Sequence, residues 1–338
     1  MMKAIVVNNP AGLNNISTTE LPDPGQPQAG QIRVALHATS LNFHDLLVAN
    51  GTIPTENGRV LMSDGAGVVE AVGEGVTEFA VGDHVVSCFF PQWLDSQPFN
   101  AVADFQGTPG DGIDGYATEY TVRPATAFTH APRSWSHAEA ATITTAGLTA
   151  WRALVVNGQL KAGDSVLVMG SGGVSIAALQ IAKAMGAHVI ATTGSEQKIK
   201  QLRELGADHV INYRSTPEWG QHVLELTNGQ GVDHIVEVGG PGTLAQSIRA
   251  AKVGGHIALI GVLTGFSGEV PTMELMSKQI RLQGLIVGSR RQQQDYVAAL
   301  EQAEIRPIIH SSFPLEQLAD AFRQQELGEH FGKIVVEW

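Results

Sequence analysis

The sequence predicts an α/β protein in which a six-stranded, doubly wound parallel sheet is joined to a β-rich domain. Its 338 residues are enough for about two domains. Up to about residue 122 the chain consists of short, β-branched segments separated by turn residues. From residue 151 onward, apolar segments alternate with amphipathic helical ones, which is typical of a parallel sheet covered on both faces.

The composition excludes several classes of protein. The net charge of -12 offers no basic surface for the phosphates of a nucleic acid. No apolar run reaches the length of about 18 residues that a membrane helix needs, and the first apolar run is too short for a signal peptide. A single cysteine, Cys88, can form no intramolecular disulfide. We therefore expect a cytoplasmic protein that binds neither nucleic acid nor membrane.

Three segments are expected along the chain. The β-rich domain covers residues 1–126, the domain with the parallel sheet covers 127–289, and a C-terminal segment covers 290–338. That last segment has two helical patterns and ends in the strand-like KIVVEW, and it is too small for a third domain. We expect it to pack on the first domain. The predicted strands of the sheet are Ser165–Met169, His188–Thr192, His209–Tyr213, Val232–Val238, His256–Val262 and Arg281–Val287.

The first strand of this sheet leads into a glycine-rich turn and a helix. Gly170, Gly172 and Gly173 form the turn, and Val174 begins the apolar face of the helix. Such a turn lets the backbone approach a pyrophosphate, whose charge the free N–H groups of the helix N-terminus stabilise. The alternative is that these glycines only permit a tight turn. The full strand, turn, helix and strand pattern favours a dinucleotide-binding Rossmann sheet.

The end of the second strand indicates which dinucleotide binds. An enzyme selective for NAD normally has Asp or Glu there, to accept a hydrogen bond from the ribose 2′-hydroxyl. This chain has Thr193, followed by Ser195 and Lys198, and Tyr213 ends the third strand. Hydroxyls and a cation suit a 2′-phosphate, so the sequence predicts NADP(H) over NAD(H). In the alternative, Lys198 is an ordinary exposed lysine and the nearby Glu196 turns toward the ribose.

The whole chain resembles the medium-chain dehydrogenase/reductase superfamily, in particular its zinc-free, quinone-oxidoreductase-like branch. The resemblance implies a GroES-like catalytic domain formed by both ends of the chain, with the Rossmann domain inserted between them. It also implies a cleft between the domains and a homodimer joined through the Rossmann sheets. The motifs that carry it are SLNFHDLLVANG, GAGVVEAVGEGV, VGDHVV, TTAGLTAW, VMGSGGVS, LGADHVINY and HFGKIVV.

The same resemblance implies that no metal is bound. Zinc-dependent relatives have cysteine or histidine ligands where this chain has Asn42, Ser63 and Thr145. Their structural zinc lobe corresponds to residues 89–115, which contain no cysteine. Because zinc prefers cysteine and histidine ligands, we expect neither site to exist.

Three catalytic candidates follow from the resemblance. Asn42 would face the nicotinamide and donate to a substrate oxygen; the alternative is a turn or capping asparagine. His44 would relay a proton, and the alternative is a structural histidine paired with Asp45. Thr145 would face the active site, whereas in the alternative its hydroxyl bonds the preceding helical turn, as for Thr149.

The resemblance also implies further cofactor contacts. Thr149 would lie beside the nicotinamide, and the glycine-rich crossings that contain Gly239, Gly261 and Val262 would approach it with their backbone. Lys333 would reach the pyrophosphate; the alternative is an edge-strand lysine that prevents aggregation.

These features predict an NADPH-dependent, zinc-independent oxidoreductase that acts on a small quinone or α,β-unsaturated carbonyl. Such substrates delocalise the charge that hydride transfer creates, so they need the least help from the protein. One alternative is a zinc-free alcohol or aldehyde dehydrogenase of the same fold. Another is a nucleotide-binding regulatory protein with little turnover. Four aromatic residues form either a hydrophobic lid over the substrate or ordinary core packing: Phe90, Trp93, Phe99 and Phe105.

Overall fold

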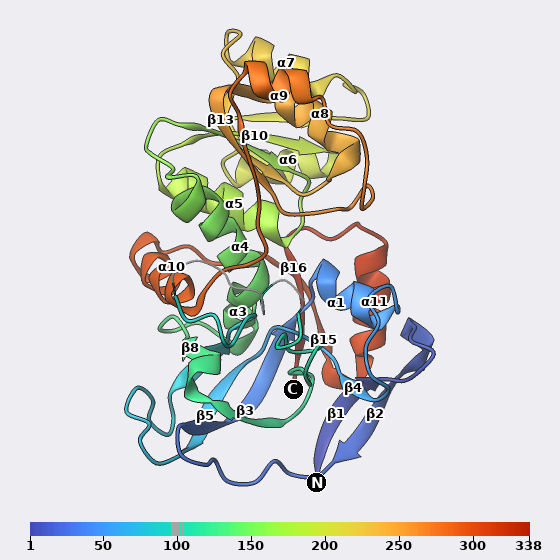
Figure 1. The fold of residues 1–338 in the computed structure, drawn as a ribbon, viewed down its shortest axis with the longest axis vertical. Coiled ribbons are helices and arrows are strands. Elements are labelled where there is room, and N and C mark those ends of the chain that lie inside the picture. Colours follow the sequence, from blue (N-terminus) through green and yellow to red (C-terminus); the bar gives the residue numbers. More distant parts are fainter. Residues whose placement is uncertain (96–101, 103–104) are drawn as a thin grey trace. The chain divides into compact units, whose positions relative to one another are not determined.

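The computed structural model describes residues 1–95, 102 and 105–338. The chain divides into two compact units, which Figure 1 shows in the colours of the sequence. One unit contains Met1–Leu148 and Val287–Trp338, and the other contains Thr149–Ile286. The second is thus inserted within the sequence of the first. No helix in the described residues is long and apolar enough to cross a membrane.

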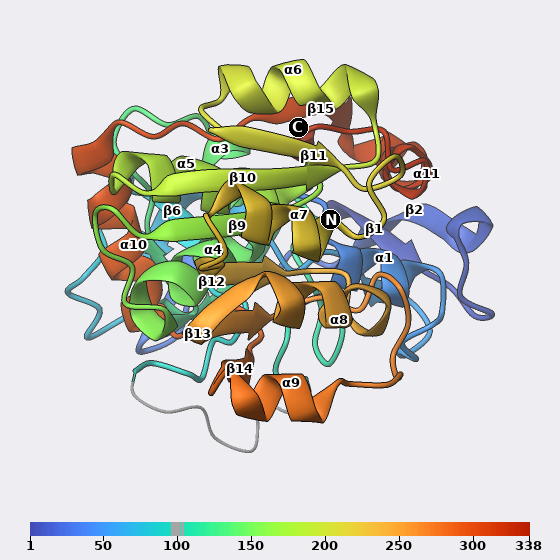
Figure 2. The same cartoon turned by 90° about the horizontal axis from the view of Figure 1, so that it is seen from above.

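The inserted unit has the predicted Rossmann sheet. All neighbouring strands are parallel, in the order β11-β10-β9-β12-β13-β14 (Figure 2). The strands are β9 (Ser165–Met169), β10 (His188–Thr193), β11 (His209–Asn212), β12 (Val232–Glu237), β13 (Ala251–Leu259) and β14 (Arg281–Gly284). The helices are η4 (Arg152–Asn157, a π-helix), α5 (Gly173–Ala184), α6 (Glu196–Glu204), α7 (Trp219–Leu226), α8 (Pro241–Ala250) and α9 (Thr272–Ser277), while α4 (Leu148–Trp151) lies at the boundary of the unit.

Burial explains why these strands read as continuous apolar runs. In β9 and β10 every residue after the first is buried, because parallel strands with helices on their faces expose little to water. One strand begins earlier than predicted: β13 starts at Ala251, since an irregularity lets Ala251 pair with Val232 before the regular register begins at His256.

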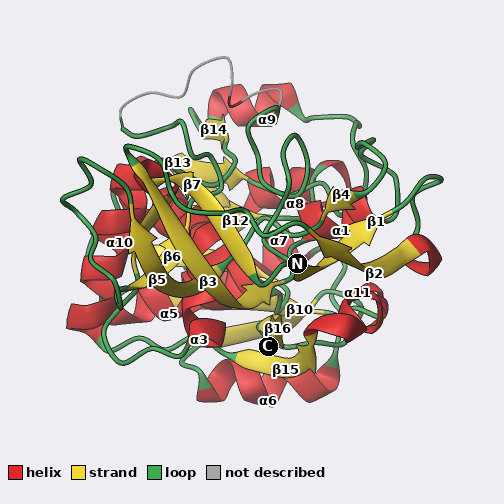
Figure 3. Ribbon diagram, turned by 90° about the horizontal axis from the view of Figure 1, so that it is seen from below, coloured by secondary structure: helices red, strands yellow, loops and turns green. Residues whose placement is uncertain are grey.

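The unit formed by both ends of the chain is β-rich. Its larger sheet has the order β15-β16-β3-β5-β6-β8, with β7 also pairing with β3, and its smaller sheet has the order β2-β1-β4 (Figure 3). The strands are β1 (Met2–Val7), β2 (Ile16–Leu21), β3 (Gln31–Ser40), β4 (Arg59–Val60), β5 (Ala66–Val72), β6 (His84–Ser87), β7 (Tyr120–Pro124), β8 (Phe128–His130), β15 (Ile309–Pro314) and β16 (Lys333–Glu337). The helices are η1 (Leu13–Asn15), α1 (Phe43–Ala49), η2 (Ala125–Ala127), α3 (His137–Ala141), η3 (Ile143–Gly147, a π-helix), α10 (Arg290–Ala303), η5 (Leu315–Gln317) and α11 (Leu318–Glu326).

This unit extends past residue 126, where the sequence placed its end. Strand β8 pairs with β6, and helix α3 packs on β3, β5 and β6. Residues up to Leu148 therefore belong to the same compact unit. At the other end, β16 pairs antiparallel with β3, with Val335 opposite Ser40. The C-terminal segment thus completes the sheet of the β-rich unit.

Candidate active site

The turn between β9 and α5 has the features that a pyrophosphate site needs. Gly170 adopts φ 72°, a backbone conformation that favours glycine. Gly172 is the N-cap of α5 and makes no side-chain cap, and a Cβ on Gly172 would meet no atom within 4 Å. Ser175 replaces the third glycine of the usual fingerprint, and its hydroxyl donates to the Met169 carbonyl oxygen. The turn therefore leaves room for a ligand above uncapped helical N–H groups.

The residues predicted to read the ribose lie at adjacent strand ends. The backbone N–H of Tyr213 donates to the Thr193 carbonyl oxygen at 3.0 Å, and the Ser195 N–H donates to the Thr193 hydroxyl at 3.1 Å. A Cβ on Gly194 would lie 2.5 Å from the Tyr213 hydroxyl and 3.0 Å from Arg214 Nε. Because Gly194 has no side chain, the Tyr213 phenol and the Arg214 guanidinium can both lie at the end of β10. The sequence analysis did not identify Gly194.

Glu196 and Lys198 are the two side chains on which the alternative to an NADP(H) site depends. Asn212 Nδ2 donates to the Glu196 carboxylate, and Asn212 ends β11 opposite Thr193 of β10. Lys198 is half-buried rather than fully exposed, in the first turn of α6.

The crossing after β12 is organised by a carboxylate that sequence reasoning also missed. Glu237 is completely buried, and its Oε1 accepts from the N–H groups of Gly239 at 2.8 Å and Gly240 at 3.0 Å. The hydroxyls of Thr243 and Ser247 donate to the same carboxylate. The motif Glu-x-Gly-Gly at a strand end was the available signal, because a buried acid requires several donors.

The second glycine-rich crossing is bonded to the first. Thr264 Oγ1 donates to the Gly239 carbonyl oxygen and accepts from the Gly242 N–H, both at 2.8 Å. A Cβ on Gly261 would lie 2.1 Å from the Val238 carbonyl oxygen, so only glycine fits there. Val262 is half-buried beside it.

A buried polar network contains three of the residues singled out in the sequence. Asn42 Nδ2 donates to Asp64 Oδ2 at 2.8 Å and to Asp45 Oδ2 at 3.0 Å. Its Oδ1 accepts from Lys333 Nζ, which also donates to the Leu41 carbonyl oxygen and lies 3.9 Å from Asp64 Oδ2. Thr145 Oγ1 donates to Asp64 Oδ1 at 2.6 Å. The network therefore brings Asn42, Thr145 and Lys333 together around Asp64.

This network bears on three of the alternatives. Asn42 is the N-cap of α1, with a capping box to Asp45, so its capping role exists beside any role toward a substrate. Lys333 is not an edge-strand lysine, because β16 lies between β15 and β3 and its side chain is buried. Thr145 bonds Asp64 and not a preceding carbonyl. Thr149 is buried, and its contact with the cofactor stays a prediction.

Electrostatics in the network follow from burial. Burial raises the pKa of the Asp64 carboxyl to about 6, and the nearby Asp45 adds to the shift, while Lys333 and the hydroxyls of Ser40 and Thr145 oppose it. Burial also lowers the pKa of Lys333, against the attraction of Asp64 and Asp45. A carboxyl that titrates near neutrality inside a buried cluster is a candidate for proton transfer.

His44 has a different partner from the one considered above. Its Nε2 lies 3.1 Å from Asp111 Oδ2, whereas the Asp45 carboxylate accepts from Asn42 and from the Ser63 N–H. The pairing with Asp45 is therefore wrong: at the N3 position of α1, Asp45 turns back to cap the helix. The His44 ring stacks on Phe105 with centroids 5.4 Å apart, and its Nδ1 is buried without a hydrogen-bond partner.

Two of the four aromatic residues considered for a lid are core residues. Phe90 and Trp93 are buried, which favours core packing over a lid for these two. Phe105 is half-buried against His44. Phe99 lies outside the described residues.

The donor atoms of the network do not fit a zinc ion. Lys333 presents an ammonium, Asn42 already uses its amide oxygen on that ammonium, and the neighbouring hydroxyls donate to Asp64. Within residues 1–95, 102 and 105–338, no group of three or more His, Cys, Asp or Glu could hold a metal ion.

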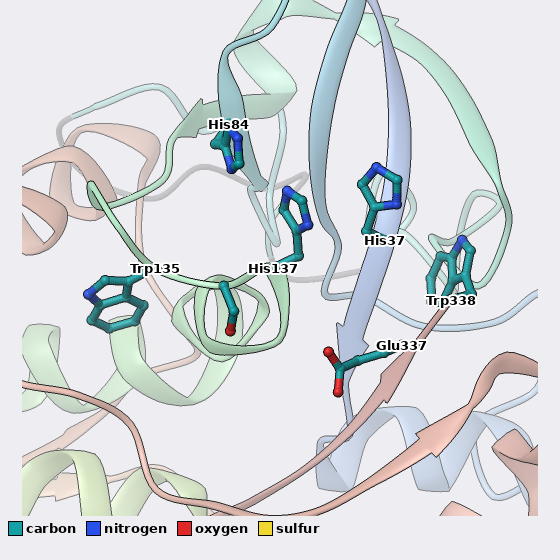
Figure 4. Close-up of a pocket in the computed structure, with 7 residues that line it drawn as sticks. His37, His84, Trp135, His137, Glu337 and Trp338 are labelled. Carbon is teal, nitrogen blue, oxygen red and sulfur yellow. The ribbon is translucent and has the colours of Figure 1, made fainter.

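A histidine-lined groove of about 480 Å³ lies elsewhere in the same unit (Figure 4). The ring of His137 lies between those of His37 and His84, with centroid distances of 4.7 and 4.8 Å and interplanar angles of 28° and 17°. A metal ion lies in the plane of an imidazole ligand, so such nearly parallel rings cannot share one. Burial and the two neighbouring rings lower the pKa of His137 to about 4.

Comparisons with known proteins agree with this architecture. A model described as alcohol dehydrogenase GroES-like domain matches residues 28–133, and a model described as zinc-binding dehydrogenase matches residues 173–304. A zinc-type alcohol dehydrogenase-like protein of Schizosaccharomyces pombe is 37% identical to this chain over 345 residues, which cover 99% of each protein.

Solved structures are similar over the whole chain. A Sinorhizobium meliloti 1021 protein assigned as an alcohol dehydrogenase has a TM-score of 0.91 and 39% identity, covering 100% of this chain and 98% of that one. An NAD-dependent alcohol dehydrogenase has a TM-score of 0.89 and 35% identity, with both chains fully covered. A mycobacterial protein in complex with NADPH has a TM-score of 0.83 and 27% identity, again with full coverage of both chains.

Proposed function

This chain belongs to the medium-chain dehydrogenase/reductase superfamily and is an NAD(P)-dependent oxidoreductase; on that premise we propose that it is a zinc-independent, NADPH-dependent reductase of quinones or α,β-unsaturated carbonyls. The observation that carries the proposal is the network around Asp64, where an ammonium and hydrogen-bond donors fill the place of a metal. A bound dinucleotide supplies the hydride.

The substrate class follows from what the network offers to a developing oxyanion. Thr145 is half-buried, whereas Asn42, Asp64 and Lys333 are buried, so we expect a substrate to approach the Thr145 hydroxyl. A single neutral donor stabilises an oxyanion by about 2.7–4 kcal/mol of barrier. This stabilisation by one donor is most nearly sufficient for substrates that delocalise the negative charge over a conjugated system, as quinones and enones do.

NADPH is favoured by the end of β10. Thr193 stands where an NAD-selective enzyme has an acid, and Glu196 is bonded to Asn212. Tyr213 and Arg214 lie beside Gly194. Ser195 is the N-cap of α6, and Lys198 lies in the first turn of that helix. This set offers hydroxyls and cations to a 2′-phosphate and no carboxylate to a 2′-hydroxyl.

The test is a turnover panel with purified, chelator-treated protein. We expect NADPH oxidation with quinones and enones, at a rate that a zinc chelator does not change. NADPH should bind at least about ten times more tightly than NADH, a difference of about 1.4 kcal/mol. Tighter binding of NADH, or activity that zinc restores, would reject the corresponding half of the proposal.

A second candidate is a zinc-free alcohol or aldehyde dehydrogenase. It is favoured by the similarity to an NAD-dependent alcohol dehydrogenase across both full chains. The panel separates the two, because only this candidate oxidises alcohols at rates comparable with the reduction of enones. If no acceptor or alcohol is turned over while NADPH still binds, a regulatory nucleotide-binding protein becomes the better description.

The proposed assembly is a homodimer through the Rossmann sheet. Within the described residues β14 is the terminal strand of that sheet, and apolar side chains are exposed in the chain segments that precede and follow it. In sedimentation velocity, a Met273→Glu/Met276→Glu variant should be monomeric where the wild type is dimeric, and an unchanged dimer would reject this surface. The exposed residues are Leu263, Phe266, Met273, Met276 and Ile286.

A further inference from the structure

Asp64 is connected to the protein surface through one side chain. Among its side-chain partners, Ser40, Asn42 and Lys333 are buried, and only Thr145 is half-buried. The Thr145 hydroxyl lies 2.6 Å from Asp64 Oδ1. Because a hydroxyl both donates and accepts a hydrogen bond, it can pass a proton between a buried carboxyl and an outside oxygen.

The charges around Asp64 suit a group that gains and loses a proton. Lys333 faces it from β16 and Asp45 from α1, and the hydroxyls of Ser40 and Thr145 face it from β3 and η3. With Asp64 protonated, the ammonium and the Asp45 carboxylate balance each other. With Asp64 ionised, the buried cluster carries one net negative charge, which Lys333 stabilises from 3.9 Å.

We propose that Asp64 stores the proton of the reaction and that the Thr145 hydroxyl carries it between Asp64 and the substrate oxygen. This inference rests on the proposed function. In the direction of reduction, the hydride brings two electrons to the substrate carbon, and Thr145 gives its hydroxyl proton to the substrate oxygen. Thr145 regains a proton from the Asp64 carboxyl, whose O–H bond breaks. Asp64, left ionised opposite Lys333, is reprotonated from water by the same route.

Thr145 is the catalytic residue of this relay, and Asp64 and Lys333 act through it as positioning residues. Thr145→Val should lower kcat at least about 100-fold with a smaller change in KM, the usual loss for a missing acid catalyst. Thr145→Ser, which keeps the hydroxyl, should retain kcat within about ten-fold. Thr142→Val is the matched control, because the Thr142 hydroxyl bonds only the Glu139 carbonyl oxygen of its own helix; it should behave as the wild type.

The pH profile separates a proton store from a structural group. In the wild type, kcat for reduction should fall as the pH rises through the pKa of Asp64, and Asp64→Asn should lower kcat and abolish this dependence. A solvent isotope effect on kcat should be present in the wild type. The relay is refuted if Thr145→Val keeps the kcat of the wild type. It is also refuted if kcat of Thr145→Val depends on pH in the same way as kcat of the wild type.

A measurement without cofactor or turnover completes the test. In the infrared spectrum of the apoprotein, the difference between wild type and Asp64→Asn should contain one buried carboxylic acid band that titrates near neutrality. A carboxyl ionised throughout pH 5–8 would overturn the storage role. Failure of the wild type to turn over any acceptor refutes the proposed function instead, and the infrared titration then decides about the proton store alone.

Discussion

Removing the Glu237 side chain should destabilise the Rossmann unit and weaken nucleotide binding together. Its carboxylate accepts four hydrogen bonds, two of them from the N–H groups of Gly239 and Gly240. In Glu237→Ala these two buried amides lose their partner, at about 1–3 kcal/mol each, while the hydroxyls of Thr243 and Ser247 can rotate to other acceptors. We therefore expect a loss of about 2–6 kcal/mol in the free energy of unfolding.

Glu237→Gln is the matched control for that loss. Its amide oxygen can still accept from Gly239 and Gly240, and its amino group faces Ser247, whose hydroxyl can turn to accept. The expected loss is about 1 kcal/mol. Urea unfolding followed by circular dichroism gives both values, and NADPH titration gives the affinities. If Glu237→Ala unfolds within about 1 kcal/mol of the wild type, the carboxylate does not organise this crossing.

Three further predictions follow from single residues. Burial lowers the pKa of His256 from 6.5 to about 4, so the unfolded chain binds the proton first as the pH falls. The free energy of unfolding should therefore decrease between pH 6.5 and pH 4, by at most about 3 kcal/mol. Urea titrations at several pH values should show a weaker pH dependence for His256→Gln, and the same dependence as in the wild type would contradict this prediction. Gly194→Val should weaken NADPH binding more than NADH binding, because its Cβ would displace Tyr213 and Arg214; equal losses would argue against a 2′-phosphate site there. Burial raises the pKa of the Cys88 thiol to about 12, so iodoacetamide at pH 8 should label it only in unfolded protein, and rapid labelling of the native chain would show that it is accessible.

The Rossmann unit could be predicted because its signals are local. Each strand is a continuous apolar run that ends in a turn, and the observed order β11-β10-β9-β12-β13-β14 is the usual order for six such strands. Even Ser175, the departure from the glycine fingerprint, keeps the close packing of helix on strand by bonding the Met169 carbonyl oxygen. The β-rich unit was less predictable, because strands such as Ile309–Pro314 alternate half-buried and exposed positions over only six residues.

Partners of single side chains were the hardest to predict, because they depend on contacts distant in sequence. His44 has an acid beside it at Asp45, but its partner is Asp111, 67 residues away. Local reasoning chose the neighbour, although the capping box at the start of α1 already engages Asp45. The motif Asn-x-x-Asp before a helix was the signal that could have excluded that pairing.

The position of Lys333 shows how topology, rather than local pattern, creates the candidate site. Strand β16 adds antiparallel to β3, and the register that sets Val335 opposite Ser40 brings Lys333, two residues earlier, alongside Asn42, two residues later. A lysine on a central strand would normally be costly, and here the amide oxygen of Asn42 and the Leu41 carbonyl oxygen accept from its ammonium. The same pairing sets that ammonium 3.9 Å from Asp64. The strand that closes the sheet therefore also delivers the cation, so a shift of this register should disrupt the site and the fold together.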